Sequence, residues 1–185
     1  LCFPSQFGCT QDVPTYDYNP EKAKKLLAEA GYPDGFETPF LAYRNRDYAE
    51  AMINNLNAVG IKAKLEYLKY AAFRDKVQSG GAPFNFGTWG SYSINDVSAI
   101  TSHFQSGGKD DYSKDPEVIK QLGIGDTSVD ANVRQAAYKA ALSRISGEAF
   151  MFPLWSYNTW YAFSKDVDFN PTPDEIPRFF TAKWM

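Results

Sequence analysis

Apolar and polar residues follow regular patterns along most of the chain, and these patterns predict a series of helices and strands. Within residues 20–30 the apolar positions repeat at helical spacing. Asn19 can accept hydrogen bonds from the first free amides of this helix, and Pro20 can begin it because its φ is already fixed. Gly31 can adopt the left-handed conformation that ends a helix, and residues 32–35 (Tyr-Pro-Asp-Gly) are typical of a turn.

A strand, a helix and a second strand follow this turn. Residues 36–42 form an apolar run, and residues 48–59 carry an apolar stripe at helical spacing that Gly60 can end. Residues 61–67 then alternate between apolar and charged side chains, which is typical of a half-buried strand. Because a connection of this length between two strands forms a right-handed crossover, we expect the strands to pair in parallel.

The rest of the chain is predicted to be mainly helical, with a few strands. In chain order, we expect a helix at 70–78, a short strand at 84–88, a helix that Asn95 or Ser93 caps and that runs to Phe104, a polar loop at 105–113, helices at 116–122 and 129–147, and paired strands at 151–157 and 159–164. The helix at 129–147 is the longest, and its small apolar face would let it pack closely on a sheet.

Several stretches of the sequence occur together, and in the same order, in one known family. They are YDYNPEKAKKLLAEAGYPDGF, NNLNAVGIKAKLEYL, FNFGTWGSY, DYSKDPEVIKQL and DANVRQAAYKAALSRISGEAFMFPLW. Together they resemble the C-terminal lobe of the peptide/nickel-type (family 5) solute-binding proteins that serve bacterial ABC importers. The resemblance implies an α/β fold with a mixed, mainly parallel sheet flanked by helices, as in the C-terminal lobe of a periplasmic-binding-protein-like fold.

The resemblance also predicts how the chain is organised. Residues 1–185 are expected to form one ligand-binding lobe, with a cysteine-containing loop at residues 1–15 and an irregular tail at residues 166–185. Because the chain begins within a loop at Leu1 and carries no signal peptide, we expect a fragment whose N-terminal lobe and export signal lie upstream. The parent protein is expected in the periplasm, or outside the cytoplasm on a lipid tether.

Composition and charge narrow the functional classes. Hydrophobic residues make up 44% of the chain and charged residues 22%, which is typical of a globular domain. The net charge of −3 argues against a nucleic-acid-binding surface, and no apolar run approaches the roughly 20 residues of a membrane-spanning helix. Aromatic residues reach 16%, which suits a ligand-binding cleft, although many of these rings would also fill a core.

The cysteines and the histidine limit the possible chemistry. Cys2 and Cys9 enclose a short loop and can form a disulfide in an oxidising compartment; two free thiols are the alternative. No metal site is expected, because His103 is the only histidine and the two cysteines have no partner pair. The lone histidine also leaves no Ser-His-Asp set, and no phosphate-binding glycine loop is present. We therefore expect a protein that is not an enzyme and needs no cofactor.

The segment after the predicted strand at 84–88 is the strongest candidate for a ligand site, because open α/β sheets bind ligands beyond the ends of their strands. Trp89 and Tyr92 could stack on a ligand, while Ser91 and Asn95 offer hydrogen bonds. The alternative is a connecting loop whose polar residues only cap the next helix.

In the peptide-binding members of the family, the matching motif carries an aspartate two or three residues after the tryptophan, and this aspartate pairs with the free amine of the peptide. Here Ser91 and Tyr92 occupy those places, and the first acid is Asp96. Asp96 could replace the missing charge, or it could lie in the first turn of a helix, where a carboxylate is favourable. The departure weakens the prediction of an ordinary peptide ligand.

Two further groups could reach a ligand. Arg44 and Asn45 lie at the corner after the strand at 36–42, where relatives contact ligand and where a guanidinium could bind a carboxylate; an exposed turn is the alternative. Trp155 and Tyr157 would share one face of a strand, facing either the ligand or the interior. Arg134 occupies a position that is structural in the family.

The resemblance implies a receptor that closes two lobes around a small oligopeptide-type solute and presents it to an ABC permease in the inner membrane. The alternatives are the same role for an oligosaccharide, an opine or a metal chelate, or a chaperone or interaction module outside transport. Lys22, Lys24 and Lys25 form either a solvated helix face or part of a surface that docks on the permease.

Overall fold

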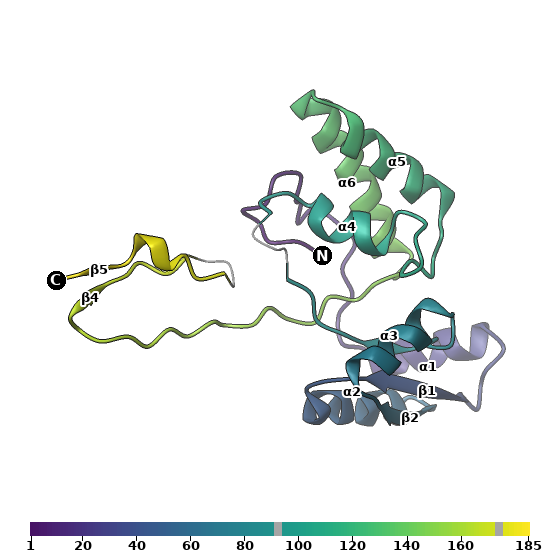
Figure 1. Ribbon diagram of the computed structural model, residues 1–185. Helices are drawn as coiled ribbons and strands as arrows, with labels where there is room; N and C mark the ends of the chain where they lie inside the picture. Colours follow the sequence, from purple (N-terminus) through teal and green to yellow (C-terminus); the bar gives the residue numbers. More distant parts are fainter. Residues whose placement is uncertain (91–93, 173–175) are drawn as a thin grey trace. The chain divides into compact units, whose positions relative to one another are not determined.

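A computed structural model describes residues 1–90, 94–172 and 176–185 (Figure 1). The chain forms two compact units. One consists of residues 15–88, and the other of residues 1–14 together with residues 89–185.

The unit of residues 15–88 is a helix followed by a three-stranded α/β layer. Its elements are α1 (Pro20–Glu29), β1 (Phe36–Ala42), α2 (Arg46–Ala58), β2 (Ile61–Tyr67), α3 (Tyr70–Gln78) and β3 (Asn85–Phe86). The strand order is β2-β1-β3, and β1 pairs in parallel with both neighbours. The predicted parallel pairing of the strands at 36–42 and 61–67 and the α/β fold class are therefore confirmed, although β3 is shorter than the predicted strand at 84–88.

The alternation of side chains along β1 gives the sheet two apolar faces. Phe40 and Ala42 pack with α2, whose buried residues Ala49 and Ile53 belong to the same cluster. Leu41 points the other way and packs with buried residues of α3. Because helices cover both faces, the central strand can be apolar along much of its length, as parallel strands usually are.

The start and end of α1 follow the local signals. The side chain of Asn19 accepts a hydrogen bond from the Lys22 amide at 2.9 Å, and Pro20 is the first helical residue. The turn after the helix needs Gly35, because a Cβ there would lie 1.8 Å from the carbonyl oxygen of Gly60. This close approach lets the chain pass directly from the turn into β1.

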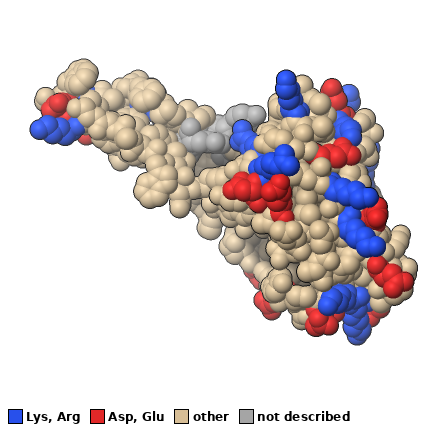
Figure 2. Space-filling model, turned by 90° about the horizontal axis from the view of Figure 1, so that it is seen from below, with Lys and Arg blue, Asp and Glu red and all other residues tan. Residues whose placement is uncertain are grey.

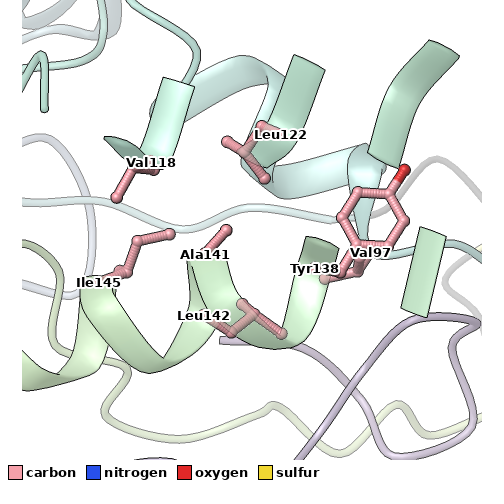
Figure 3. Packing of buried hydrophobic residues seen from close by; sticks show 7 residues of the cluster. All are labelled: Val97, Val118, Leu122, Tyr138, Ala141, Leu142 and Ile145. Carbon is pink, nitrogen blue, oxygen red and sulfur yellow. The ribbon is translucent and has the colours of Figure 1, made fainter. Parts of the chain in front are cut away.

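The second unit is built around three helices, α4 (Ser98–Phe104), α5 (Pro116–Thr127) and α6 (Ala131–Gly147). Asp115 and Asp130 cap α5 and α6 with side-chain hydrogen bonds to their first amides. The buried face of α6 packs against α5 and not on a sheet, which corrects the expected packing of this helix (Figure 3). The core shown there comprises Val97, Val118, Leu122, Tyr138, Ala141, Leu142 and Ile145.

Helix α5 extends beyond the predicted end at residue 122 and continues through Gly123 and Gly125. A Cβ at Gly125 would lie 2.5 Å from the Tyr138 ring, and one at Gly8 would lie 2.4 Å from the same ring. The buried tyrosine of α6 is therefore held between two glycines from different parts of the unit.

The predicted strand pair at 151–157 and 159–164 is wrong. Residues 151–164 adopt no regular secondary structure and form no ladder with each other. Alternation of apolar residues indicates two faces, but a strand also needs a hydrogen-bonding neighbour. The predicted irregular tail instead holds short strands β4 (Val167–Asp168) and β5 (Lys183–Trp184), which pair antiparallel, and a 3-10 turn η1 (Phe179–Thr181).

Candidate functional site

The first group of site residues lies in the unit of residues 15–88, at the carboxyl ends of β1 and β3. Arg44 follows β1 and donates a hydrogen bond from Nη1 to the hydroxyl of Thr88 at 3.1 Å. Its guanidinium carbon lies 5.1 Å from the centre of the Tyr43 ring, and the Tyr43 hydroxyl is 3.1 Å from the same threonine oxygen. The Arg44 side chain is thus oriented by two neighbours while the residue remains exposed.

Asn45 has an unusual backbone. It lies in the left-handed region with φ of 51°, and its side chain makes no capping bond to α2. Its carbonyl oxygen accepts the amides of Tyr48 and Ala49, each at 3.1 Å, so the backbone alone starts the helix. Non-glycine residues in this region concentrate at functional sites, which keeps Asn45 as a candidate contact.

The sequence analysis gave no ligand-binding role to Tyr43, or to Thr88, which begins the candidate segment around Trp89. Both follow parallel strands that end at the same edge of the sheet, and this shared position was the signal that could have found them. Together with Arg44 they offer a forked cation and two hydroxyl groups, a combination that suits a carboxylate.

Trp89 lies in the other unit and packs against α4. Its Nε1 donates to the carbonyl oxygen of Ala99 at 3.1 Å, and its ring stacks on His103 with centroids 4.2 Å apart. The edge-on ring of Phe104 lies 5.0 Å away. The residue is only partly buried, so it is not sealed in a core. Because its N–H is used internally, what the indole can offer a ligand is ring surface.

The predicted cap of α4 is wrong for Asn95. The helix begins at Ser98, and the carboxylate of Asp96 accepts the Ser98 amide at 3.0 Å. Asn95 is exposed, and its carbonyl oxygen accepts the Phe7 amide at 3.1 Å. The helix starts late because the segment before it pairs with the N-terminal loop. The other predicted cap, Ser93, and the predicted site residues Ser91 and Tyr92 lie outside the described residues.

Asp96 is engaged within the protein. Besides the Ser98 amide, it accepts a hydrogen bond from Nη2 of Arg134 at 2.6 Å. Burial opposes the charged form of Asp96, but the hydrogen bonds from Ser98 and Arg134 outweigh it and lower its pKa. Of the two predicted roles of Asp96, these contacts match that of a carboxylate near the start of a helix and not that of an acid that pairs with the amine of a ligand.

Arg134 connects Asp96 to the helical core. Its Nε donates to the carbonyl oxygen of Gly125 at 2.9 Å, and its Nη2 also donates to the Tyr138 hydroxyl at 3.0 Å. The Tyr138 hydroxyl in turn donates to Asp126 at 2.8 Å. Desolvation raises the pKa of Tyr138 to about 12, so its hydroxyl remains a donor at neutral pH. These contacts agree with a structural role for Arg134.

The predicted disulfide between Cys2 and Cys9 is confirmed. We call residues 2–9, which it closes, the disulfide loop. Phe7 of this loop forms an isolated parallel bridge with Asp96. The cysteines are therefore linked in space to the segment that follows Trp89.

Trp155 and Tyr157 lie close together, with ring centroids 6.3 Å apart in an edge-to-face arrangement. Both are about half exposed, at 46% and 50%. Tyr157 also borders an open hollow of about 380 Å³ that is lined by Tyr157, Asn158, Thr159, Tyr161, Pro171 and Thr172. Another open hollow, of about 280 Å³, is lined by residues of β1 and β2, Glu37, Thr38, Pro39, Lys64 and Glu66, none of which is a predicted site residue.

The described residues offer neither a metal-binding cluster nor a membrane-spanning helix. They contain no group of three or more histidine, cysteine or acidic side chains arranged to hold a metal ion. None of the helices within the described ranges has both the length and the apolar character needed to span a bilayer.

Comparison with known proteins gives one family. The profile described as "Bacterial extracellular solute-binding proteins, family 5 Middle" matches residues 1–111. Heme-binding protein A of Haemophilus influenzae is 34% identical over 85 residues, which cover 42% of this chain and 16% of that protein. Glutathione-binding protein GsiB of Salmonella choleraesuis is 36% identical over 66 residues, which cover 34% of this chain and 13% of that protein.

A solved structure shares the fold over nearly the whole chain. It is a dipeptide binding protein from Pseudoalteromonas sp. SM9913 in complex with Met-Leu, with a TM-score of 0.75 and 23% identity. The match covers 98% of this chain and 39% of that protein. The chain therefore spans less than half the length of the proteins that it resembles.

Proposed function

Because the chain belongs to family 5 of the bacterial extracellular solute-binding proteins, we propose that it forms the C-terminal lobe of a receptor that captures an oligopeptide-type solute. The receptor then delivers this solute to the membrane permease of an ABC importer. The match of the family profile to residues 1–111 carries the proposal. A glutathione-binding relative supports a peptide-type ligand.

The receptor works by closing two lobes around the ligand, and no covalent step is required. Closure is favourable only if the ligand makes contacts in the closed form that it lacks in the open form. Within the unit of residues 15–88, Arg44 and Thr88 offer polar groups to a carboxylate. Within the other unit, taken by itself, the Trp89 ring offers an apolar surface. Each lobe contributes part of the wall, so we expect this chain alone to bind ligand weakly.

The last part of the chain supports the existence of a second lobe. Figure 2 shows that the segment of residues 151–185 carries few charged groups. The segment exposes many large apolar side chains, namely Phe152, Leu154, Trp155, Tyr157, Trp160, Phe163, Ile176, Phe179, Phe180, Trp184 and Met185. Such a surface is larger than a soluble protein normally leaves in water. We assign its partner to the part of the parent protein beyond this chain.

The contacts of Asp96 bear on the class of ligand. Its two carboxylate oxygens are held by Ser98 and Arg134, so we do not assign it to the free amine of a peptide. This favours a ligand that is recognised mainly through a carboxylate. Binding of the alternative ligands, an opine, an oligosaccharide or a metal chelate, would not require an acidic residue that pairs with a peptide amine.

The location of the parent protein follows from the same family. We propose that it acts outside the cytoplasm, in the periplasm or on a lipid tether, where it can meet the permease. The Cys2–Cys9 disulfide supports this location, because disulfides persist in oxidising compartments.

A thermal-shift screen tests the function. A protein that contains both lobes is melted alone and with the dipeptide Met-Leu, reduced glutathione, N-acetylated Met-Leu, haem, an opine and an oligosaccharide. At ligand concentrations about 100-fold above Kd, we expect a stabilisation of about 2.7 kcal/mol with a peptide-type ligand. A shift with the sugar or the opine only would assign a different ligand class, and no shift with any of them would contradict the proposal for these classes.

A further inference from the structure

The disulfide loop is hydrogen-bonded to residues 94–97, which immediately precede α4. The amide of Phe7 donates to the carbonyl oxygen of Asn95 at 3.1 Å, and the amide of Val97 donates to the carbonyl oxygen of Phe7 at 3.0 Å. These reciprocal bonds fix both strands of the contact in one register. The segment before α4 therefore depends on the loop for its backbone hydrogen bonds.

The side chain of Gln6 strengthens the same attachment. It is 8% exposed, donates from Nε2 to the carbonyl oxygen of Ile94 at 3.2 Å, and accepts the amide of Phe3 through Oε1 at 3.0 Å. One amide group thus joins the inside of the disulfide loop to the segment outside it. Its burial makes both hydrogen bonds costly to lose.

Helix α6 holds the other side of the contact. The guanidinium of Arg134 lies 4.7 Å from the centre of the Phe7 ring while it donates to Asp96 at 2.6 Å. Gly8 lies directly against the Tyr138 ring, with no room for a side chain. Arg134 therefore contacts both the disulfide loop and the segment before α4, and Tyr138 packs against the loop at Gly8.

We propose that the disulfide loop, Asp96 and Arg134 act together to position the Ile94–Val97 segment, and that covalent closure of the loop is needed for full ligand affinity. The proposal rests on the proposed function, in which Trp89, a few residues before this segment, contacts ligand, and it adds the exposed Asn95 of the segment as a further contact. Without the disulfide, residues 2–9 gain conformational freedom that each bond to the segment must then offset. Asp96 is in this account a positioning residue and not a ligand contact.

Amide hydrogen exchange tests the positioning. The Cys2→Ser/Cys9→Ser variant should exchange the Phe7 and Val97 amides about tenfold faster, relative to the Ile145 amide of α6, because each amide donates to a carbonyl oxygen across this contact and loses a stable acceptor. Asp96→Ala should speed exchange at Val97 in the same way. Unchanged relative exchange at Phe7 and Val97 in the double cysteine variant would overturn the proposal.

The chain provides a matched control on the same helix. Arg144 of α6 donates to Asp115 at 2.8 and 2.6 Å, and neither residue belongs to the contact with the disulfide loop. Asp115→Asn weakens this second aspartate–arginine pair but keeps a good capping residue for α5. Its relative exchange at Phe7 and Val97 should equal that of the unmodified protein.

Calorimetry with Met-Leu and with reduced glutathione tests the link to binding, in a protein that contains both lobes. For a probe that the unmodified protein binds, we expect about tenfold weaker affinity in the double cysteine variant and in Asp96→Ala, and a change of less than about twofold in Asp115→Asn. Faster exchange without loss of affinity would overturn the role in binding. If the unmodified protein bound neither probe, the proposed peptide ligand would fail, while the exchange result alone would still support or overturn the positioning role.

Discussion

Replacing Gly125 by alanine should destabilise the protein, although alanine is the better helix former. Gly125 lies inside α5, where alanine gains about 1 kcal/mol over glycine from helix propensity. However, the added Cβ would lie 2.5, 2.8 and 2.9 Å from three atoms of the fully buried Tyr138 ring. The substitution therefore sets a small local gain against a severe steric overlap.

The ring has nowhere to move. Gly8 lies against the Tyr138 ring from another part of the unit. The Tyr138 hydroxyl donates a hydrogen bond to Asp126 and accepts one from Arg134. Overpacking a fixed core site costs about 1–3 kcal/mol, and displacing the hydroxyl costs about 1 kcal/mol for each hydrogen bond lost. After subtraction of the propensity gain, Gly125→Ala should lower the free energy of unfolding by about 2 kcal/mol.

Gly123 provides a control two residues away. It lies in the same helix and is exposed, and a Cβ there would meet no atom within 4 Å. Gly123→Ala should therefore stabilise the protein by up to about 1 kcal/mol. Thermal melting followed by circular dichroism should place the two variants on opposite sides of the unmodified protein, with Gly125→Ala about 5 °C lower. An equal or higher melting temperature for Gly125→Ala would refute the reasoning about Tyr138.

Three further predictions follow from single contacts. Ala149 has φ of 53° just after α6, so Ala149→Gly should stabilise the protein by about 1 kcal/mol in a denaturant titration; a lower midpoint would contradict this. The hydrogen bond and charge of Arg144, together with the bonds from the first amides of α5, lower the pKa of Asp115 to about 2 from 3.8. Because the pKa is lowered in the folded state, the ionised Asp115 should stabilise the fold above about pH 4, and this stabilisation should be lost as the pH falls towards 2. In acid titrations the free energy of unfolding of Asp115→Asn should therefore fall less than that of the unmodified protein. Identical dependence on pH in the two proteins would exclude the Asp115–Arg144 pair as a cause of acid destabilisation. Arg44→Ala should weaken binding of a carboxylate ligand about tenfold by calorimetry. Arg46→Ala removes an exposed pair with Glu50 and a contact with the Tyr67 ring 5.6 Å away, and it should leave the affinity unchanged; equal loss of affinity in both variants would argue against a specific role for Arg44.

The sequence predicted well the elements whose ends are set by local chemistry. Asn19 and Pro20 start α1 as expected, and the predicted strand at 61–67 has the bounds of β2, although the alternation of burial breaks at the end, where Tyr67 is exposed. Each of these signals acts within a few residues of the feature that it sets. The parallel pairing of β1 and β2 also follows from local information, because the length of the connection fixes its topology.

The elements that the sequence predicted poorly depend on distant partners. The start of α4 is delayed because Ile94, Asn95 and Val97 bond to a loop almost ninety residues earlier, at Gln6 and Phe7. No local pattern near residue 95 contains this information. Residues 151–164 likewise alternate as a strand does, but they have no pairing neighbour within the described chain.

The candidate site shows the same division. The position of Arg44 at the end of β1 could be predicted from the strand that precedes it, and its contact with Thr88 follows from the parallel pairing of β1 and β3. The Arg134 partner of Asp96 could not be predicted, because it lies 38 residues further along the chain, on α6. A carboxylate near the start of a helix is compatible with ligand binding and with internal pairing, and only the fold distinguishes them.

A hydrogen-exchange footprint of the bound ligand tests the central claim most directly. The protein should contain both lobes, and the ligand should be the one that raises its melting temperature most. We predict slower exchange on binding in peptides that contain Arg44 and in peptides that contain Trp89, with no change in α1. A protected surface that includes neither residue, or a protein that binds none of the solutes tested, would contradict the account.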